Sequence, residues 1–282
     1  MKTIQNTAIL VFLLAFNSIL YGGERIKLTI LHTNDTHSQI EPTEKSNLPV
    51  SDKGGYARRM GIIEQIRQQN KNVLLFDAGD FWQGTPYFNF YNGRIEVDGM
   101  NKMKYDAVTL GNHEFDNGLD TMATVLKNAQ FPILTSNYQM DSTAMATLVK
   151  PYLIIRKAGL KIGVMALNVN PKGLIFRNNY KKMNYNDPVE TAINISNFLK
   201  RSEKCDLIIC LSHLGADTLK QTLTDYDIIR KTRYIDVMIG GHSHQIITQT
   251  NVKNAAGKPV VLAQMGKSGL YLGRIDLELE KK

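Results

Sequence analysis

The sequence Thr109-Leu110-Gly111-Asn112-His113-Glu114-Phe115-Asp116 joins a short apolar run to a helical pattern. The four residues before it form a β-branched and apolar run, which indicates a buried strand. Gly111 lets the backbone turn sharply after that strand. Asn112 then offers a carbonyl oxygen to a divalent cation, and His113 offers an imidazole that the Asp116 carboxylate could orient. The stretch therefore predicts metal-assisted chemistry on an anionic substrate, and a plain polar turn is the alternative.

Apolar runs and helical patterns alternate along the rest of the chain. Candidate strands cover residues 26–31, 73–76, 107–110, 132–135, 152–156, 161–167, 207–211, 237–239, 260–264 and 270–279. Candidate helices cover residues 55–69, 93–103, 119–128, 188–200 and 217–231. Such alternation is typical of an α/β fold. The closing strands from residue 270 look like part of a hairpin, so we expect mixed sheets and not purely parallel ones.

Five of the candidate strands are followed at once by residues that can bind a metal ion. In chain order these residues are Asp35 and His37, then Asp80, Asn112, His213, and finally His242 and His244. In open α/β sheets the ligand site lies at the carboxyl ends of the strands, so the fold should bring these loops together. Five of the six histidines of the chain lie in these loops, which makes a coincidence of core residues a poor explanation.

The number of candidate ligands predicts a binuclear metal site. Asp35, His37 and His244 would hold one ion, and Asn112, His213 and His242 the other, with Asp80 bridging them. Carboxylate, amide and imidazole ligands suit Zn, Mn, Fe or Co better than Ca or Mg. Two divalent ions about 3.5–4 Å apart can hold the attacking and leaving oxygens, and a metal-bound water loses its proton near neutral pH. Such a site would supply a hydroxide nucleophile without any protein nucleophile.

The first 23 residues have the layout of a secretory signal peptide. Lys2 gives a positive start, residues 8–16 are uninterruptedly apolar, and small residues close the segment at Gly22 and Gly23. The apolar run is shorter than the roughly 20 residues of a membrane span. We therefore expect an exported protein, periplasmic or extracellular, without a stable membrane span. The pattern does not define the exact position at which the signal peptide is cleaved. Residues 24–282 are expected to form a single domain.

Charge and cysteine content narrow the function further. The net charge is +8, but lysine and arginine are scattered along the chain, whereas a nucleic-acid surface needs them clustered. We therefore expect no nucleic-acid partner and a mild preference for anionic ligands. Cys205 and Cys210 flank a candidate strand at an odd spacing that puts them on opposite faces, so they should not form a disulfide.

Taken together, these blocks resemble the calcineurin-like metallophosphoesterases, and most of all the metallophosphatase domain of the secreted 5′-nucleotidase family. The blocks are Thr33 to His37, Asp77 to Asp80, Gly111 to Asp116, Ser212 to Gly215, and Gly240 to His244. The resemblance implies a four-layer αββα sandwich with two mixed sheets and the metal ligands assigned above. It also implies that His113 and Asp116 are the catalytic pair. His113 would stabilise the phosphoryl transition state or protonate the leaving oxygen, and Asp116 would fix its tautomer.

One departure from the family affects the expected function. Family members usually continue into a C-terminal domain that binds the nucleobase, and this sequence ends where the first domain would end. We expect a dinuclear-metal phosphoester hydrolase that acts above all on nucleotides, with attack by a metal-bound hydroxide on phosphorus. A separately encoded 5′-nucleotidase C-terminal domain is a candidate partner. The alternatives are a cyclic nucleotide phosphodiesterase, a nucleotide-sugar or sulfur-ester hydrolase with the same metal centre, or a non-catalytic subunit that retains the fold.

Overall fold

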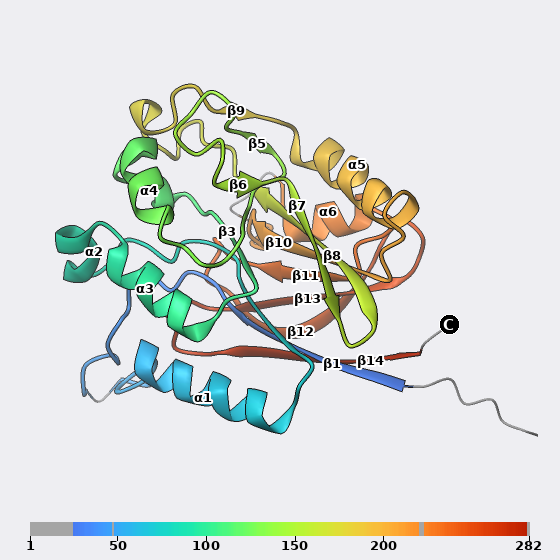
Figure 1. The fold of residues 1–282 in the computed structure, drawn as a ribbon, viewed down its shortest axis with the longest axis horizontal. Coiled ribbons are helices and arrows are strands. Elements are labelled where there is room, and N and C mark those ends of the chain that lie inside the picture. Colours follow the sequence, from blue (N-terminus) through green and yellow to red (C-terminus); the bar gives the residue numbers. More distant parts are fainter. Residues whose placement is uncertain (1–24, 47, 220–222, 281–282) are drawn as a thin grey trace, which may run out of the picture.

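The computed structural model describes residues 25–46, 48–219 and 223–280. Two six-stranded sheets pack against each other, and helices cover their outer faces (Figure 1). The segment predicted to be a signal peptide, residues 1–23, lies outside the described residues. Within the described part of the chain, no helix is both long and apolar enough to cross a membrane.

The strands of each sheet come from separate parts of the chain. The first sheet has the order β14 (Gly273–Glu280), β1 (Arg25–Thr33), β2 (Val73–Asp77), β3 (Ala107–Thr109), β4 (Ile133–Leu134), β6 (Val149–Lys150). The second has the order β12 (Ile246–Lys253), β13 (Pro259–Met265), β11 (Val237–Gly240), β10 (Leu207–His213), β8 (Leu160–Asn168), β7 (Tyr152–Lys157). A separate ribbon pairs β5 (Tyr138–Gln139) with β9 (Asn184–Tyr185).

Both sheets are mixed, as predicted. Strands β1, β2, β3, β4 and β6 run parallel, and so do β8, β10, β11 and β13. Antiparallel strands lie at the edges, where β14 pairs with β1 and where β7 and β12 flank the second sheet. The expectation of a hairpin from residue 270 onward is wrong, because β14 pairs with the first strand of the chain. Antiparallel pairs that are close in sequence join β7 to β8 and β12 to β13, and β12 was not predicted.

The helices are α1 (Tyr56–Gln69), α2 (Pro86–Tyr91), α3 (Arg94–Met103), α4 (Gly118–Leu126), α5 (Pro188–Arg201) and α6 (Asp225–Lys231), with 3₁₀ turns η1 (His113–Phe115) and η2 (Arg177–Asn179). Helix α5 begins as predicted, because the Asp187 carboxylate accepts the Glu190 N–H at 2.8 Å. The prediction of a helix from 217 to 231 is wrong for residues 217–219 and 223–224, which the structure describes as non-helical. A capping box between Thr224 and Asp227 starts α6 at residue 225.

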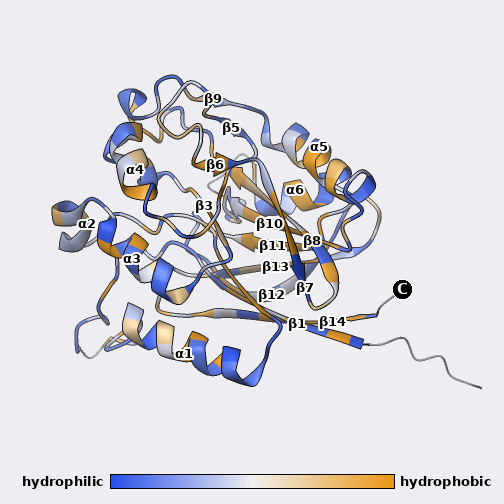
Figure 2. Ribbon diagram, in the orientation of Figure 1, coloured by the Kyte–Doolittle hydropathy of each residue, from blue (hydrophilic) through white to orange (hydrophobic). Residues whose placement is uncertain are grey.

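Three apolar layers hold the four structural layers together. Along β2, Val73 and Leu75 pack towards α1 and α3, whereas Leu74 and Phe76 pack towards the second sheet. The second sheet turns its other face to α5 and α6, where Cys210 lies buried. Figure 2 shows both hydrophobic and hydrophilic residues along the helices and strands, as expected where each element has a buried and an exposed side. The predicted four-layer αββα sandwich is therefore confirmed, and Cys205 and Cys210 are both buried and unpaired.

Candidate metal centre

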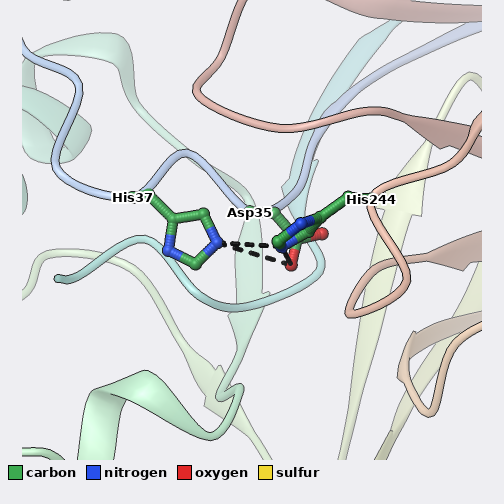
Figure 3. A group of neighbouring side chains, drawn as sticks. All are labelled: Asp35, His37 and His244. Carbon is green, nitrogen blue, oxygen red and sulfur yellow. Dashed lines mark hydrogen bonds and ion pairs between the residues drawn. The ribbon is translucent and has the colours of Figure 1, made fainter. Parts of the chain in front are cut away.

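A first group of side chains gathers where β1 and β11 end. The Asp35, His37 and His244 ligand atoms all lie within 4.8 Å of one another. The His37 and His244 Nε2 atoms are 3.0 Å apart, and His244 Nε2 lies 3.4 Å from Asp35 Oδ1. Figure 3 shows His37 facing Asp35 and His244 from the opposite side. Two strands that are neighbours in neither sequence nor sheet thus place three potential ligands around one point.

A second group lies beside the first. The Asp80, His213 and His242 ligand atoms also lie within 4.8 Å of one another, and His213 Nε2 is 3.1 Å from Asp80 Oδ2. The two groups are adjacent, because His213 Nε2 also lies 4.0 Å from Asp35 Oδ1. Asn112 stands at the end of β3, and its Oδ1 is buried with no hydrogen-bond partner among the described residues. The fold thus gathers the seven predicted ligands at neighbouring strand ends.

The polar atoms of both groups fit divalent cations. The Nδ1 atom of His213 donates to the Ala78 carbonyl at 2.6 Å, so Nε2 is the nitrogen that faces Asp80. Fixing one ring nitrogen of a histidine in this way orients the other towards a metal. Gly111 keeps the space open, since a Cβ there would lie 2.1 Å from Asp80 Oδ1 and 2.6 Å from His213 Nε2.

Backbone strain is concentrated at these side chains. The φ angles are 48° at Asp35, 47° at His37, 56° at Asp80, 68° at His242 and 55° at His244. Left-handed backbone is uncommon for residues other than glycine, and each such residue costs on the order of 1–3 kcal/mol. Five of the seven predicted ligands adopt it, so the surrounding structure holds them in place at a cost in stability.

Charge in the site favours a cation. Burial alone would lower the pKa of His213, but the Asp80 and Asp35 carboxylates raise it to about 10. Burial together with the charge of His213 lowers the pKa of His242 to about 4. The buried carboxylates therefore attract a positive charge. A proton on His213 supplies it in the metal-free protein, and a metal ion would compete for the same place.

The predicted catalytic pair lies at the open side of these groups. The His113 Nδ1 atom is 3.0 Å from Asp116 Oδ2, and this hydrogen bond raises the pKa of His113. The His113 and His37 ring centroids are 5.4 Å apart. Both side chains of the pair are partly exposed, whereas Asp35 and His213 are fully buried. His113 therefore faces the entrance and belongs to neither group of potential ligands.

Glu114 has a part in the site that the sequence interpretation missed. Its buried carboxylate accepts three backbone N–H groups, from Asp80 at 2.9 Å, Trp82 at 3.1 Å and Gly111 at 2.5 Å. It thus joins the loop after β2 to the loop after β3. The signal was present, because a glutamate three residues after a turn residue has the spacing of a capping box.

Buried hydrogen bonds also fix the two sheets relative to each other beneath the site. The Asn168 side-chain amide, at the end of β8, donates to Leu110 O at 2.5 Å and to Thr109 Oγ1 at 3.0 Å. The Asn34 side chain, after β1, donates to Gly266 O and accepts from Met265 N, both at 2.8 Å. Because the potential ligands come from both sheets, these bonds set their separation.

Fold and site agree with the comparison to known proteins. The family model of the calcineurin-like phosphoesterases matches residues 28–246, so this chain belongs to that family. The chain is 34% identical over 277 residues to a snake venom 5′-nucleotidase of Crotalus adamanteus, covering 91% of this chain and 46% of the venom protein. It is 32% identical over 293 residues to a 5′-nucleotidase of Homo sapiens, covering 96% of this chain and 50% of the human protein.

Solved structures give the same result. A 5′-nucleotidase precursor from Thermus thermophilus is similar with a TM-score of 0.81 and 32% identity, over 89% of this chain and 51% of that one. The NAD nucleotidase of Haemophilus influenzae has a TM-score of 0.82 at 29% identity, over 91% of this chain and 48% of that one. The chain therefore spans about half the length of these relatives.

Proposed function

We propose that this chain is a phosphoester hydrolase that uses two divalent metal ions and acts above all on nucleotides. One observation carries the proposal. Two adjacent groups, each with its ligand atoms within 4.8 Å, lie beside a histidine–carboxylate pair at 3.0 Å. The family and the similarity to 5′-nucleotidases support the same activity. Asp35, His37 and His244 would hold one ion, Asn112, His213 and His242 the other, and Asp80 would bridge them.

The ions, when bound, would neutralise phosphate charge and activate a water molecule. Imidazole, amide and carboxylate ligands together suit Zn, Mn, Fe or Co. The protein's own residues do the rest. Asp80 and Asp35 hold the positive charge in a buried site, where charge stabilisation is stronger than in water. The Asn112 carbonyl oxygen, which is buried without a hydrogen-bond partner among the described residues, would bind an ion, and the Asn112 side-chain NH2 group would help to seat the phosphate.

His113 would act on the leaving group. Its Nδ1 atom is bonded to Asp116, which fixes the ring and leaves Nε2 for the substrate. The raised pKa of His113 favours the protonated form, which can donate a proton to the leaving oxygen. Asp116 would stabilise the imidazolium and hold its orientation. The pair needs no covalent intermediate with the protein.

A partner domain would complete substrate recognition. The catalytic turn is flanked by two surface segments, since Asn117 bonds to Asn92 at 3.0 Å and Asn179 bonds to Asp116 O at 2.8 Å. Exposed aromatic residues stand on both segments, and Phe90 is 78% exposed. We infer that a separately encoded 5′-nucleotidase C-terminal domain binds over His113 and Asp116, which are partly exposed. A contact that includes Asn34 and Asn112, as the sequence suggested, does not fit the structure, because both residues are buried. Adding it should lower KM for nucleoside monophosphates far more than for p-nitrophenyl phosphate.

The proposed setting is outside the cytoplasm. The first 23 residues have the charge and hydropathy pattern of a signal peptide. We propose export to the periplasm or the extracellular space. N-terminal sequencing of the protein recovered from the medium or the periplasm would test this directly.

The test of the function is hydrolysis with defined metals. The metal-free protein is loaded with Mn or Zn and assayed with AMP, p-nitrophenyl phosphate and its bis ester. We expect monoester hydrolysis that disappears after chelation. A preference for the bis ester would favour the phosphodiesterase alternative, and no hydrolysis with any loaded metal would favour a non-catalytic subunit.

A further inference from the structure

The entrance to the metal centre is a cleft of about 300 Å³. Its lining includes three histidines, and the other lining residues are Gln39, Gln83, Gly84, Lys267 and Ser268. Of all the lining residues, Lys267 alone carries a fixed positive charge, and no carboxylate is among them. A substrate whose phosphate lies at the buried ligands has to extend its leaving group through this cleft.

The segment that carries Lys267 is fixed to the ligand loops on both sides. Ser268 N donates to Asp35 O at 2.7 Å, and Gly266 N donates to Gln245 O at 2.9 Å. The Asn34 amide bonds to Gly266 O at 2.8 Å. The backbone of Lys267 is thus held beside the first group of potential ligands, while its side chain is exposed.

The polar groups of the cleft are available for a ligand. The Lys267 ammonium has no hydrogen bond or ion pair with any residue in the described part of the chain. Gln83 also lines the cleft, with φ at 68°, and its side-chain amide likewise has no partner among residues 25–46, 48–219 and 223–280. One ammonium and one amide next to the metal centre form a set of hydrogen-bond donors for an anion.

We propose that Lys267, together with Gln83, binds a second anionic group of the substrate next to the scissile bond. This inference rests on the proposed hydrolase function and extends it to phosphoanhydrides such as nucleoside diphosphates. In that reaction the oxygen of water forms a bond to the terminal phosphorus, and the bond from that phosphorus to the bridging oxygen breaks. The electron pair stays on the bridging oxygen of the departing nucleoside monophosphate, whose charge Lys267 neutralises, and the proton lost by the water passes to solvent.

Binding without turnover tests the site. Calorimetry on the metal-loaded protein, with excess metal, compares phosphonoacetate with methylphosphonate, which lacks the second anionic group. We expect the wild type to bind phosphonoacetate about tenfold more tightly, which is the size of effect that one hydrogen bond to a charged group gives. Lys267→Met should lose this preference and change methylphosphonate binding less than about threefold. The control is Lys258→Met, an exposed lysine at the opposite end of β13, which should change neither.

Turnover distinguishes this inference from the function on which it rests. We expect Lys267→Met to lower kcat/KM about tenfold for ADP and less than about threefold for p-nitrophenyl phosphate, and Lys267→Arg to restore most of the loss. An unchanged ratio between the substrates, or an equal loss for both, would overturn the second-anion site and leave the hydrolase intact. If the wild type hydrolyses neither substrate but still prefers phosphonoacetate, the proposed function fails and the anion site stands.

Discussion

His113 lies beside the two groups of potential ligands without joining either. Its Nδ1 atom is bonded to Asp116, and its side chain is partly exposed at the entrance. His242, in contrast, belongs to the second group, within 4.8 Å of the Asp80 and His213 ligand atoms. This difference in position predicts separable roles for the two histidines, with His113 acting on the substrate and His242 binding metal.

His113→Ala should keep both metal ions and lose activity. Removing a general acid typically costs about 10²–10⁴ in rate. His242→Ala should instead lose bound metal. Elemental analysis of both variants, alongside kcat with p-nitrophenyl phosphate, checks the assignment. If His113→Ala lost an ion while His242→Ala kept both, the two roles would be exchanged.

Glu114→Gln should destabilise the metal-free protein. The amide cannot accept all three backbone N–H groups that now point at the carboxylate, and an unsatisfied buried donor costs about 1–3 kcal/mol. Thermal unfolding should show a fall in Tm of roughly 2–4 °C per kcal/mol. Glu64→Gln, on the exposed face of α1, is the matched control and should leave Tm unchanged. Equal melting temperatures for the two variants would contradict the role of Glu114.

At the scale of elements, β2 ends in a buried carboxylate that shapes the loop carrying Asp80. Asp77 Oδ1 accepts the Gly79 N–H at 2.8 Å, and Asp77 Oδ2 accepts the Thr33 hydroxyl at 2.5 Å. Burial raises the pKa of Asp77 from 3.8 to about 7, against the opposing effect of these hydrogen bonds. The folded state therefore binds a proton that the unfolded state has released.

The stability conferred by Asp77 should fall as the pH rises from about 4 to about 7. Between these values the folded protein holds more protons at Asp77 than the unfolded chain, so the free energy of unfolding decreases with pH. Asp77→Asn removes this dependence. Chemical denaturation of both metal-free proteins at pH 5, 6, 7 and 8 measures the free energy of unfolding. The value for Asp77→Asn should rise relative to that of the wild type, by up to about 1.4 kcal/mol per pH unit. A constant difference across this range would refute the prediction.

Most elements could be predicted because their hydrophobic pattern is local. A few consecutive residues are enough to predict a strand from the apolar run Val73 to Phe76. The same holds for the start of a helix at Asp187 and Pro188. The partner of β14 could not be predicted, because its pairing with β1 joins Thr29 to Asp276 across most of the chain. For the site, strand ends identified the seven candidate ligands. The position of Lys267 in the cleft could not be predicted, because a single exposed lysine follows no sequence pattern and only the fold brings it beside the site.

At the scale of the whole molecule, the candidate ligands are divided between the two sheets. Four candidates follow strands of the first sheet: Asp35, His37, Asp80 and Asn112. In the second sheet, His213 is the last residue of β10, and His242 and His244 follow β11. Ions bound between them would join the sheets at one edge, in addition to the buried bonds of Asn34 and Asn168. Metal binding should therefore stabilise the entire fold.

Chelation should lower Tm as well as abolish hydrolysis. A ligand at about 1,000 times its Kd stabilises the folded state by about 4 kcal/mol per site, which is on the order of 10 °C for a chain of this size. Calorimetry of the loaded and metal-free proteins measures the shift. The shift should be smaller in His242→Ala, which serves as the control. Full activity after verified removal of metal would end the proposed mechanism.

The pairing of β14 with β1 also decides how another domain could be tethered. Gly273 lies opposite His32, near the metal edge, and Glu280 lies opposite Arg25 at the far edge. Seven residue steps of extended strand separate these positions, about 24 Å. A domain fused after residue 280 would thus start at the end of the sandwich that is far from the cleft. Its linker would need at least about eight extended residues to reach the cleft. A shorter tether could not bring such a domain to the cleft, and its effective concentration there would be close to zero.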